Sequence, residues 1–363
     1  MQALLEPLAE LADYQELLRD RKKGNGIIQV AGCTNTQKTH LMYALGDGFE
    51  YRVIAFSSEE KAKKAYEEYR LFTDDVCLYP ARDLLFYYAD IKGKVLTDQR
   101  MQVLRALIEK KEGESVTVIT TMDAFLDGLP HPGEIRGARI CAAGGDTIDL
   151  TEFEARLASM GYERESQIEG PGQFAVRGGI VDVFPLTEEL PVRIELWGDE
   201  IDSIRSFDVE SQRSVENLSE VTIYPASENW ADGLETVSFL EYFPKEKSLL
   251  FLDEPQRLQE MAEEVEQEYF HSRESRAEAG MEETQEERLR VFQTKDIIGR
   301  MNGYSGIGTT TLESRCGMFR VRKVYSIQAK GVNPYNNSFE LLTRDLTRLK
   351  REGYRVVLLS ASR

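Results

Sequence analysis

The sequence predicts an α/β protein in which a parallel sheet with helices on both faces is interrupted by a small α+β domain. Strand-like and helix-like segments alternate from residue 26 to residue 120, which is typical of βαβ units and of a parallel sheet. Near residue 137 this alternation gives way to short segments rich in β-branched and aromatic residues. An α/β pattern returns around Leu234. The length of 363 residues also favours two or more domains.

The first α/β stretch contains apolar segments of the length of buried strands, and we expect them to pair in one sheet. They are Ile27–Ala31, Tyr51–Phe56, Val76–Tyr79 and Val116–Thr120. The sequence Ser57-Ser58-Glu59-Glu60 is typical of a capping box and predicts a helix that ends near Tyr69. A second helix is predicted over residues 98–111, because its apolar residues fall on one face.

The inserted domain is expected to begin with a short helix. Thr151-Glu152-Phe153-Glu154 has the pattern of a capping box, and Gly161 is placed to end the helix that follows. Gly198-Asp199 predicts a two-residue hairpin turn between two strands. The predicted strands are Phe174–Arg177, Ile180–Phe184, Val192–Trp197 and Ile201–Phe207. Together these features predict a small antiparallel α+β domain that ends near Glu228.

The last part of the chain returns to the α/β pattern. Ser248–Leu252 is a predicted strand, and residues 257–290 are helical and strongly acidic, which favours a solvated helical arm. The sequence NNSFELLTRDLTRLKREGYRVVLLSASR then predicts a helix, a stop at Gly353 and a strand. A chain that stops directly after a strand is expected to be part of a longer protein.

The composition narrows the classes of function. A net charge of -18 favours protein partners, or nucleic-acid contacts that are made elsewhere. The apolar runs are too short to cross a membrane, and the N-terminus lacks the pattern of a signal peptide, so we expect a cytoplasmic protein with no membrane partner. The four cysteines and three histidines are scattered, so neither a disulfide framework nor a metal site is predicted.

The stretch GCTNTQKTH, residues 32–40, follows a predicted strand and matches most of the pattern of a phosphate-binding loop. Gly32, Lys38 and Thr39 occupy the expected positions of G-x-x-x-x-G-K-[ST]. Gln37 stands where the second glycine belongs, and Asn35 also brings a side chain into the space of the phosphates. A left-handed Gln37 would cost about 1–2 kcal/mol of strain. We therefore predict that this loop binds no nucleotide usefully.

The stretch LLFLDEPQR, residues 249–257, resembles the acidic magnesium motif of helicase-type ATPases. In that motif Asp253 would hold the metal through water, and Glu254 would orient the attacking water. Pro255 and Arg257 depart from the usual D-E-x-H form. Hydrolysis also needs an arginine from a second lobe, so no catalytic residue is assigned. The carboxylates of this motif, with Lys38, leave residual nucleotide binding open.

The stretch YERESQIEGPGQFAVRGGIVDVFP, residues 162–185, shows no nucleophile–base pair and no metal-ligand spacing. It places Arg164, Arg177, Phe174 and Phe184 on a predicted sheet. Arginine and aromatic side chains are frequent anchors of protein–protein interfaces. The alternative is that the phenylalanines belong to the core and the arginines are only solvated, because alternation along a strand buries one face.

Three stretches of the chain carry a resemblance to a known family: QIEGPGQFAVRGGIVDVFP, RIELWGDEIDSIRSFDVESQRS and YPARDLLFYYADIKG. They resemble the N-terminal region of the bacterial transcription-repair coupling factors (Mfd), a region that is similar in turn to the excision-repair protein UvrB. The resemblance implies a degenerate RecA-like lobe of the P-loop helicase type with an inserted α+β domain. It divides the chain into a first lobe segment (1–136), the inserted domain (137–228), a second lobe segment (229–330), and a linker with the start of a following domain (331–363).

The resemblance implies a recruiting function rather than chemistry in this chain. In the family the inserted domain recruits UvrA to a lesion-stalled RNA polymerase, and the matching residues here are Arg164, Arg177, Phe184 and Arg193. The resemblance also implies that the lobe is a scaffold without a cofactor. It implies that ATP and Mg²⁺ belong to the motor of the full-length protein, which is expected to engage RNA polymerase and double-stranded DNA as well. The protein's own C-terminal domains are expected to mask the docking surface until the motor engages.

Two other functions remain as alternatives. A UvrB-like protein that binds damaged DNA would carry a long aromatic hairpin after its third strand, but the interval from Tyr79 to Asp98 is too short for one. A lobe with residual ATP binding is opposed by Gln37 and Asn35. The sequence therefore favours a UvrA-binding adaptor over a DNA-binding protein, and both over an active ATPase.

Overall fold

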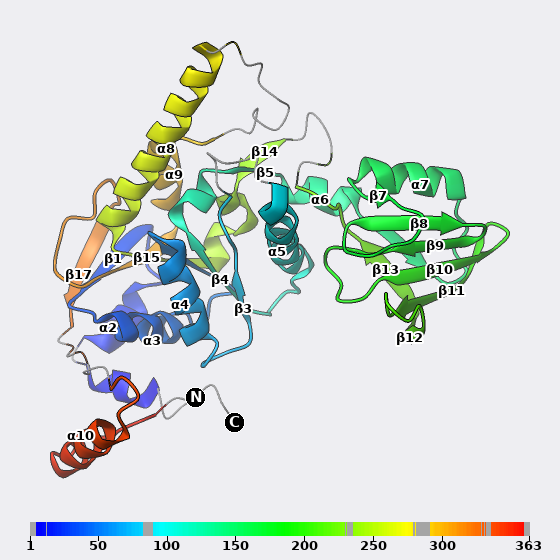
Figure 1. Cartoon of the computed structure of the whole chain (residues 1–363). Coiled ribbons are helices and arrows are strands. Elements are labelled where there is room, and N and C mark those ends of the chain that lie inside the picture. The colour runs from blue at the N-terminus through cyan, green and yellow to red at the C-terminus, as the bar shows by residue number, and fades with distance from the viewer. Residues whose placement is uncertain are drawn as a thin grey trace.

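The computed structural model describes residues 5–11, 13–82, 90–228, 230, 235–278, 280, 291–327, 329, 331 and 335–358. These residues form a large lobe around a parallel sheet and a smaller domain beside it (Figure 1). Helices α5 (Asp90–Glu109) and α6 (Pro132–Ala138) lie on the side of the lobe that faces the smaller domain. The predicted fold class, an α/β lobe with an additional small α+β domain, is confirmed.

The sheet of the lobe has seven strands in the order β17-β1-β16-β15-β2-β4-β3, and its neighbours pair in parallel. The strands are β1 (Gly26–Ala31), β2 (Tyr51–Phe56), β3 (Val76–Leu78), β4 (Val116–Thr121), β15 (Ser248–Asp253), β16 (Ser305–Thr310) and β17 (Val321–Ser326). The five strands predicted from apolar segments are all present. The sequence did not predict β16 and β17, which add one central strand and one edge strand.

Side chains that alternate along the central strands enter two apolar cores, one on each face of the sheet. Ile54 and Phe251 enter one core, whereas Val53 and Leu250 enter the other. The first core is covered by α2 (Tyr14–Asp20), α3 (Asn35–Leu45) and α4 (Glu59–Tyr69). The second is covered by α5, α8 (Pro255–Glu278) and α9 (Thr294–Met301). Burial on both faces explains why these strands read as continuous apolar runs.

Short elements complete the lobe. They are the 3-10 helices η1 (Glu6–Glu10), η2 (Met122–Phe125), η3 (Phe239–Tyr242) and η4 (Lys245–Lys247), and the antiparallel pair β5 (Gly128–Pro130) and β14 (Thr236–Ser238). Helix α10 (Phe339–Arg351) extends from the lobe near the two chain ends (Figure 1), and none of its residues is buried.

The smaller domain contains a six-stranded sheet in the order β12-β11-β10-β9-β8-β7. One face packs on α7 (Leu150–Ser159) and on the pair formed by β6 (Ile140–Ala143) and β13 (Glu220–Ile223). The predicted hairpin is confirmed, since Trp197 pairs with Glu200 across Gly198-Asp199. The strands are β7 (Glu163–Arg164), β8 (Gln173–Arg177), β9 (Ile180–Val183), β10 (Val192–Trp197), β11 (Glu200–Phe207) and β12 (Ser214–Leu218).

Two local predictions are wrong. The helix of the small domain is capped by Asp149, whose Oδ1 accepts a hydrogen bond from the Glu152 amide at 3.0 Å, and not by a box beginning at Thr151. The predicted final strand does not form in residues 354–358, which are exposed and have no neighbouring strand to pair with. The helical prediction for 257–290 holds as far as Glu278, and residues 281–290 lie outside the described residues.

Helix α5 joins the small domain to the lobe. The Arg105 guanidinium donates to the Thr187 carbonyl at 2.8 Å and to Glu188 Oε1 at 2.7 Å. Leu186, from the loop after β9, is buried in the core of the lobe. A group of four charged residues lies nearby, of which three are buried and Arg82 is half-buried, and we call it the joint cluster: Arg82, Arg100, Asp127 and Glu228.

Candidate functional site

The predicted phosphate loop and the predicted acidic motif meet at the carboxyl edge of the lobe sheet, because β1 and β15 both end there. Lys38 Nζ lies 2.7 Å from Asp253 Oδ1 and 2.7 Å from Glu254 Oε1. The Lys38 and Asp253 side chains are each only 5% exposed. These three residues, which the sequence assigned to a degenerate nucleotide site, lie side by side. We call them the loop ion cluster.

The electrostatics of the loop ion cluster favour the charged forms of Lys38 and Glu254. Burial alone would lower the pKa of Lys38, but Asp253 and Glu254 outweigh that effect, so its pKa lies above the ordinary value. Burial would raise the pKa of Glu254, yet Lys38 and Thr311 bring it below the ordinary value. Glu254 Oε1 accepts hydrogen bonds from the Thr311 amide and hydroxyl, both at 2.8 Å. The Lys38 ammonium is therefore already neutralised within the protein.

The loop itself has the shape of a helix rather than of a phosphate cradle. Helix α3 begins at Asn35, three residues before Lys38, and the Lys38 amide donates to the Thr34 carbonyl at 3.0 Å. Gln37 thus lies inside the helix with right-handed backbone, and the strain considered for a left-handed Gln37 does not arise. The Lys38 amide, which would be free to line a phosphate site in a wide loop, is bonded within the helix instead.

Gly32 is required by the fold of this chain. Its φ is +84°, and a Cβ at this position would lie 2.0 Å from the Ile327 carbonyl oxygen. The Ile327 amide donates to the Ala31 carbonyl at 2.8 Å, which holds the segment after β17 against the loop. Because Gly32 has no side chain, the backbone of the segment after β17 can lie directly against it.

Thr39 is also engaged within the protein. Its hydroxyl donates to Glu68 Oε2 at 2.8 Å, so the group that would face a magnesium ion faces a carboxylate of α4. With Lys38 held by two carboxylates and the loop wound into α3, the residues present do not fit Mg²⁺–ATP. Sequence reasoning missed Glu68, since nothing in the local pattern of α4 links it to the loop.

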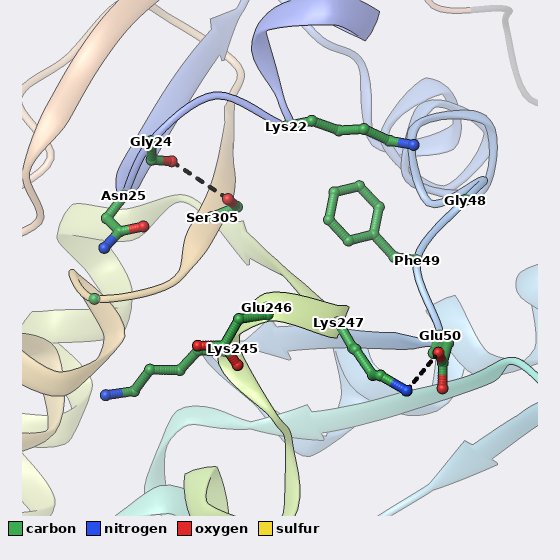
Figure 2. A pocket seen from close by; sticks show the side chains of 11 residues that line it. Lys22, Gly24, Asn25, Gly48, Phe49, Glu50, Lys245, Glu246, Lys247 and Ser305 are labelled. Atoms are coloured by element: carbon green, nitrogen blue, oxygen red, sulfur yellow. Dashed lines mark hydrogen bonds and ion pairs between the residues drawn. The ribbon is translucent and has the colours of Figure 1, made fainter. Parts of the chain in front are cut away.

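A hollow lies at the opposite edge of the sheet from the loop ion cluster, where β1, β2, β15 and β16 begin (Figure 2). Figure 2 shows Lys22 extending beside the ring of Phe49, and its Nζ lies 5.7 Å from the ring centroid. Lys247 Nζ pairs with Glu50 at 2.9 Å. These two lysines therefore already meet an aromatic ring and a carboxylate within the protein.

The small domain presents a charged sheet face on the side away from α7, which we call the outer face. Asp182 is 1% exposed and lies at its centre. The Arg177 guanidinium donates to Asp182 Oδ2 at 2.6 Å, and Arg193 donates to both Asp182 oxygens at 2.6 and 2.9 Å. Arg193 also donates to Gln212 Oε1 at 3.0 Å and stacks 4.3 Å from the centroid of Phe207. Asp182 thus orients two arginines on one face.

The four residues that the resemblance assigned to UvrA binding are placed differently from one another. Arg177 and Arg193 come together on the outer face, with side chains 45% and 16% exposed. Arg164 is exposed and pairs with Glu154 at 2.9 Å. Phe184 is buried in a small apolar cluster with Ile168, Ala175 and Phe207, so its contribution is structural support.

Sequence reasoning missed Asp182. It is the one charged residue inside the apolar run of β9, and a lone carboxylate in a buried strand needs a cationic partner. That rule would have indicated a pair with a neighbouring arginine.

Within the described part of the chain no group of three or more metal-ligating side chains is found, and no helix there is long and apolar enough to cross a membrane.

Comparison with known proteins finds a matching family and similar proteins. Residues 141–229 match the family described as the UvrB interaction domain. The transcription-repair-coupling factor of Bacillus subtilis strain 168 is 30% identical over 224 residues, which are 61% of this chain and 19% of the relative. The protein of that name from Staphylococcus haemolyticus strain JCSC1435 is 39% identical over 155 residues, which are 42% of this chain and 13% of the relative.

These matches confirm the resemblance to transcription-repair coupling factors and to the UvrB interaction domain. The matched part of the chain spans less than a fifth of the length of these two relatives. The outer face, with Arg177, Asp182 and Arg193, lies inside the segment that matches the UvrB interaction domain.

Proposed function

We propose that this chain is a UvrB-like recruiting module of a transcription-repair coupling factor, which binds UvrA and brings nucleotide excision repair to a lesion-stalled RNA polymerase. The observation that carries the proposal is the outer face of the small domain. Buried Asp182 holds Arg177 and Arg193 there, within the segment that matches the UvrB interaction domain.

The outer face has the properties of a preorganised docking surface. Arg177 is anchored at one end by Asp182, while nearly half of its side chain remains exposed. Two guanidinium groups are set against one carboxylate at Asp182, which leaves a local excess of positive charge there, while Glu195 on the same face is paired with Arg205. Arginines whose rotamers are already fixed lose less entropy on binding, and arginine is enriched among residues that dominate interface energies. A partner surface with carboxylates would therefore find donors already in position.

The lobe is proposed to be a scaffold without a cofactor of its own. The loop ion cluster supports this, because Lys38 would have to leave Asp253 and Glu254 before it could reach a phosphate. ATP and Mg²⁺ would belong to the motor of the full-length protein, which would contact RNA polymerase and double-stranded DNA. The protein's own C-terminal domains would mask the outer face, and its location would be the cytoplasm.

Calorimetric titration of this chain with purified UvrA tests the proposal. We expect the wild-type chain to bind with micromolar or tighter affinity, and Arg177→Ala to weaken binding about tenfold or more. The matched control is Arg156→Ala, an exposed arginine of α7 on the opposite side of the sheet. Both variants should keep the wild-type unfolding temperature within a few degrees. Equal affinities for the wild type and Arg177→Ala would refute the assignment of the outer face.

Titration of the chain alone with Mg²⁺–ATP separates the scaffold proposal from residual nucleotide binding. The loop ion cluster predicts no measurable isotherm. A clear isotherm that disappears in Lys38→Met would show that the cluster opens for nucleotide, and the lobe would then be a nucleotide-binding domain.

A further inference from the structure

The tip of the hairpin between β10 and β11 carries a tryptophan that the fold does not use. Trp197 is 85% exposed, the highest value among the large apolar side chains of the described residues. Gly198, with φ +64°, satisfies the turn, and Trp197 needs only strand backbone to pair with Glu200. A smaller residue would serve the hairpin equally well, so the indole ring has no structural role within this chain.

The surroundings of Trp197 restrict the kind of partner that could cover it. Backbone pairing brings the loop before α7 to the hairpin tip, since the Ile148 amide donates to the Asp199 carbonyl and the Gly145 amide to the Ile201 carbonyl, both at 2.8 Å. The five carboxylates on these two segments form what we call the acidic rim: Asp146, Asp149, Asp199, Glu200 and Asp202. Neither residues 144–150 nor residues 197–204 contain lysine or arginine.

The charge of the acidic rim decides between classes of macromolecule. Phosphate backbones and anionic membrane surfaces are disfavoured by five carboxylates on two segments without lysine or arginine, and the neighbouring Arg205 is already paired with Glu195. A second copy of this chain, with a net charge of -18, is repelled as well. A protein surface that is basic around an apolar pocket is attracted, and tryptophan is one of the residue types enriched among the contacts that dominate interface energies.

Trp197 is continuous with the outer face. The Leu196 amide donates to the Gly179 carbonyl at 2.8 Å, which ties the hairpin tip to the turn that follows Arg177. Glu195 pairs with Ile180, which in turn pairs with Arg177. Side chains alternate along β10, so Trp197 lies on the same face as Arg193 and Glu195. A partner that binds Arg177 therefore reaches Trp197 along the same strands.

From these observations we infer that Trp197 is the aromatic anchor of the UvrA interface and enters an apolar pocket with a basic rim on UvrA. This inference rests on the proposed function and extends it. It divides the interface into a cationic part, formed by Arg177 and Arg193, and an aromatic part within the acidic rim. The two parts have opposite charge, which fixes the orientation in which UvrA can bind.

Fluorine NMR can observe the proposed burial directly. The chain contains two tryptophans, Trp197 and Trp230, so 5-fluorotryptophan labelling gives two signals and Trp230→Phe identifies the signal of Trp197. Unlabelled UvrA contributes no signal. On addition of UvrA we expect the Trp197 signal to shift and to lose its sensitivity to exchange of H₂O for D₂O. A Trp197 signal that stays unchanged while UvrA is bound would overturn the inference.

Affinity measurements separate the inference from the proposed function. Trp197→Ala should weaken UvrA binding about tenfold or more, and Trp197→Phe should restore part of the loss. Val215→Ala, a substitution of a 60%-exposed side chain on β12 at one edge of the sheet, should have no effect.

If Arg177→Ala weakens binding and Trp197→Ala does not, the anchor is disproved and the proposed function stands. If the wild-type chain does not bind UvrA, the proposed function fails first. A Trp197 signal that shifts with the concentration of this chain alone would assign the tip to self-association instead.

Discussion

Lys38 illustrates how a residue of a binding motif can become a structural residue. Its ammonium group lies 2.7 Å from each of two carboxylates, and Thr39 donates its hydroxyl to Glu68. Glu254 adopts a left-handed backbone, with φ +53°, and its carboxylate is fixed by Thr311. The charges that would hold a metal–nucleotide complex thus satisfy one another, and they join α3, β15 and the segment after β16 at one edge of the sheet.

Removal of the Lys38 charge should destabilise the lobe strongly. In Lys38→Met the carboxylates of Asp253 and Glu254 face each other without a buried cation, and breaking such a pair typically costs about 3–5 kcal/mol. Urea unfolding should show this loss of unfolding free energy. The matched control is Lys61→Met, because Lys61 is 41% exposed and lies 3.6 Å from Asp253. That change should cost less than about 1 kcal/mol. Similar losses for both variants would show that the loop ion cluster does not stabilise the fold.

At the residue scale, the sequence predicted contacts that follow from motif geometry and missed those that depend on distant partners. Lys38, Asp253 and Glu254 meet because parallel strands bring motif residues to the same edge. Glu68 and Asp182 were missed because each takes its partner from another element, 29 residues away for Thr39 and Glu68. The helical conformation of Gln37 was missed because the motif pattern indicated a loop, whereas every residue type except proline enters a helix at small cost.

At the scale of the element, strand β16 shows that packing can make a segment form a strand where its sequence pattern does not predict one. Its sequence, SGIGTT, contains two glycines and would be read as a loop. It nevertheless lies between β1 and β15 and pairs with both. A Cβ at Gly308 would lie 2.8 Å from Cγ of Pro255 and 3.1 Å from Cδ1 of Ile27. The glycine therefore lets the first turn of α8 lie directly on the sheet, which positions Glu254 beside Lys38.

Substitution of Gly308 tests this packing. Gly308→Ala should lower the unfolding free energy by about 1–3 kcal/mol, because the added methyl group overpacks the contact with Pro255. The matched control is Gly137→Ala in α6, where a Cβ would meet no atom within 4 Å. That change should be neutral or slightly stabilising, since alanine favours a helix over glycine. Thermal or urea unfolding distinguishes the two, and a neutral Gly308→Ala would mean that α8 shifts freely on the sheet.

The elements that the sequence predicted well are those whose burial is visible in the chain. The central strands β2, β4 and β15 are buried on both faces and read as apolar runs. Strand β17 was missed because it lies at the edge of the sheet and contains two adjacent charged residues, Arg322 and Lys323, in place of an apolar run. No strand forms in residues 354–358 for the converse reason, since their apolar side chains have no neighbouring strand among the described residues and are exposed. Secondary structure at sheet edges thus depends on which partner is present.

At the scale of the whole molecule, the joint cluster determines how the small domain is held on the lobe. Glu228 comes where the chain leaves the small domain, and Arg100 donates to it at 2.6 Å and to Asp127 at 2.6 Å. Arg82 also pairs with Glu228. Arg100, Asp127 and Glu228 are each 1% exposed. A joint with three buried charges that interact with one another and with the half-buried Arg82 tolerates little sliding, so we expect the outer face to keep a fixed orientation relative to the lobe.

The joint cluster also predicts how stability depends on pH. Burial alone would raise the pKa of Glu228, but Arg100 and Arg82 outweigh it and hold the pKa below its ordinary value of 4.5. A carboxyl whose pKa is lower in the folded state stabilises the fold above pH 4.5, and this contribution is lost as the pH falls through the lowered pKa. The unfolding free energy of the wild type should therefore decrease below about pH 4.5.

Glu228→Gln isolates this contribution. At pH 7 the variant should be less stable than the wild type by about 3 kcal/mol, because Arg100 and Arg82 lose their buried counter-charge. Its unfolding free energy should decrease less steeply below pH 4.5, so the two curves converge in acid. Urea unfolding at a series of pH values from 7 to 3 measures both effects. Curves that run parallel over this range would show that Glu228 does not carry the linkage, and that the joint is held by the contacts of Leu186 and Arg105 instead.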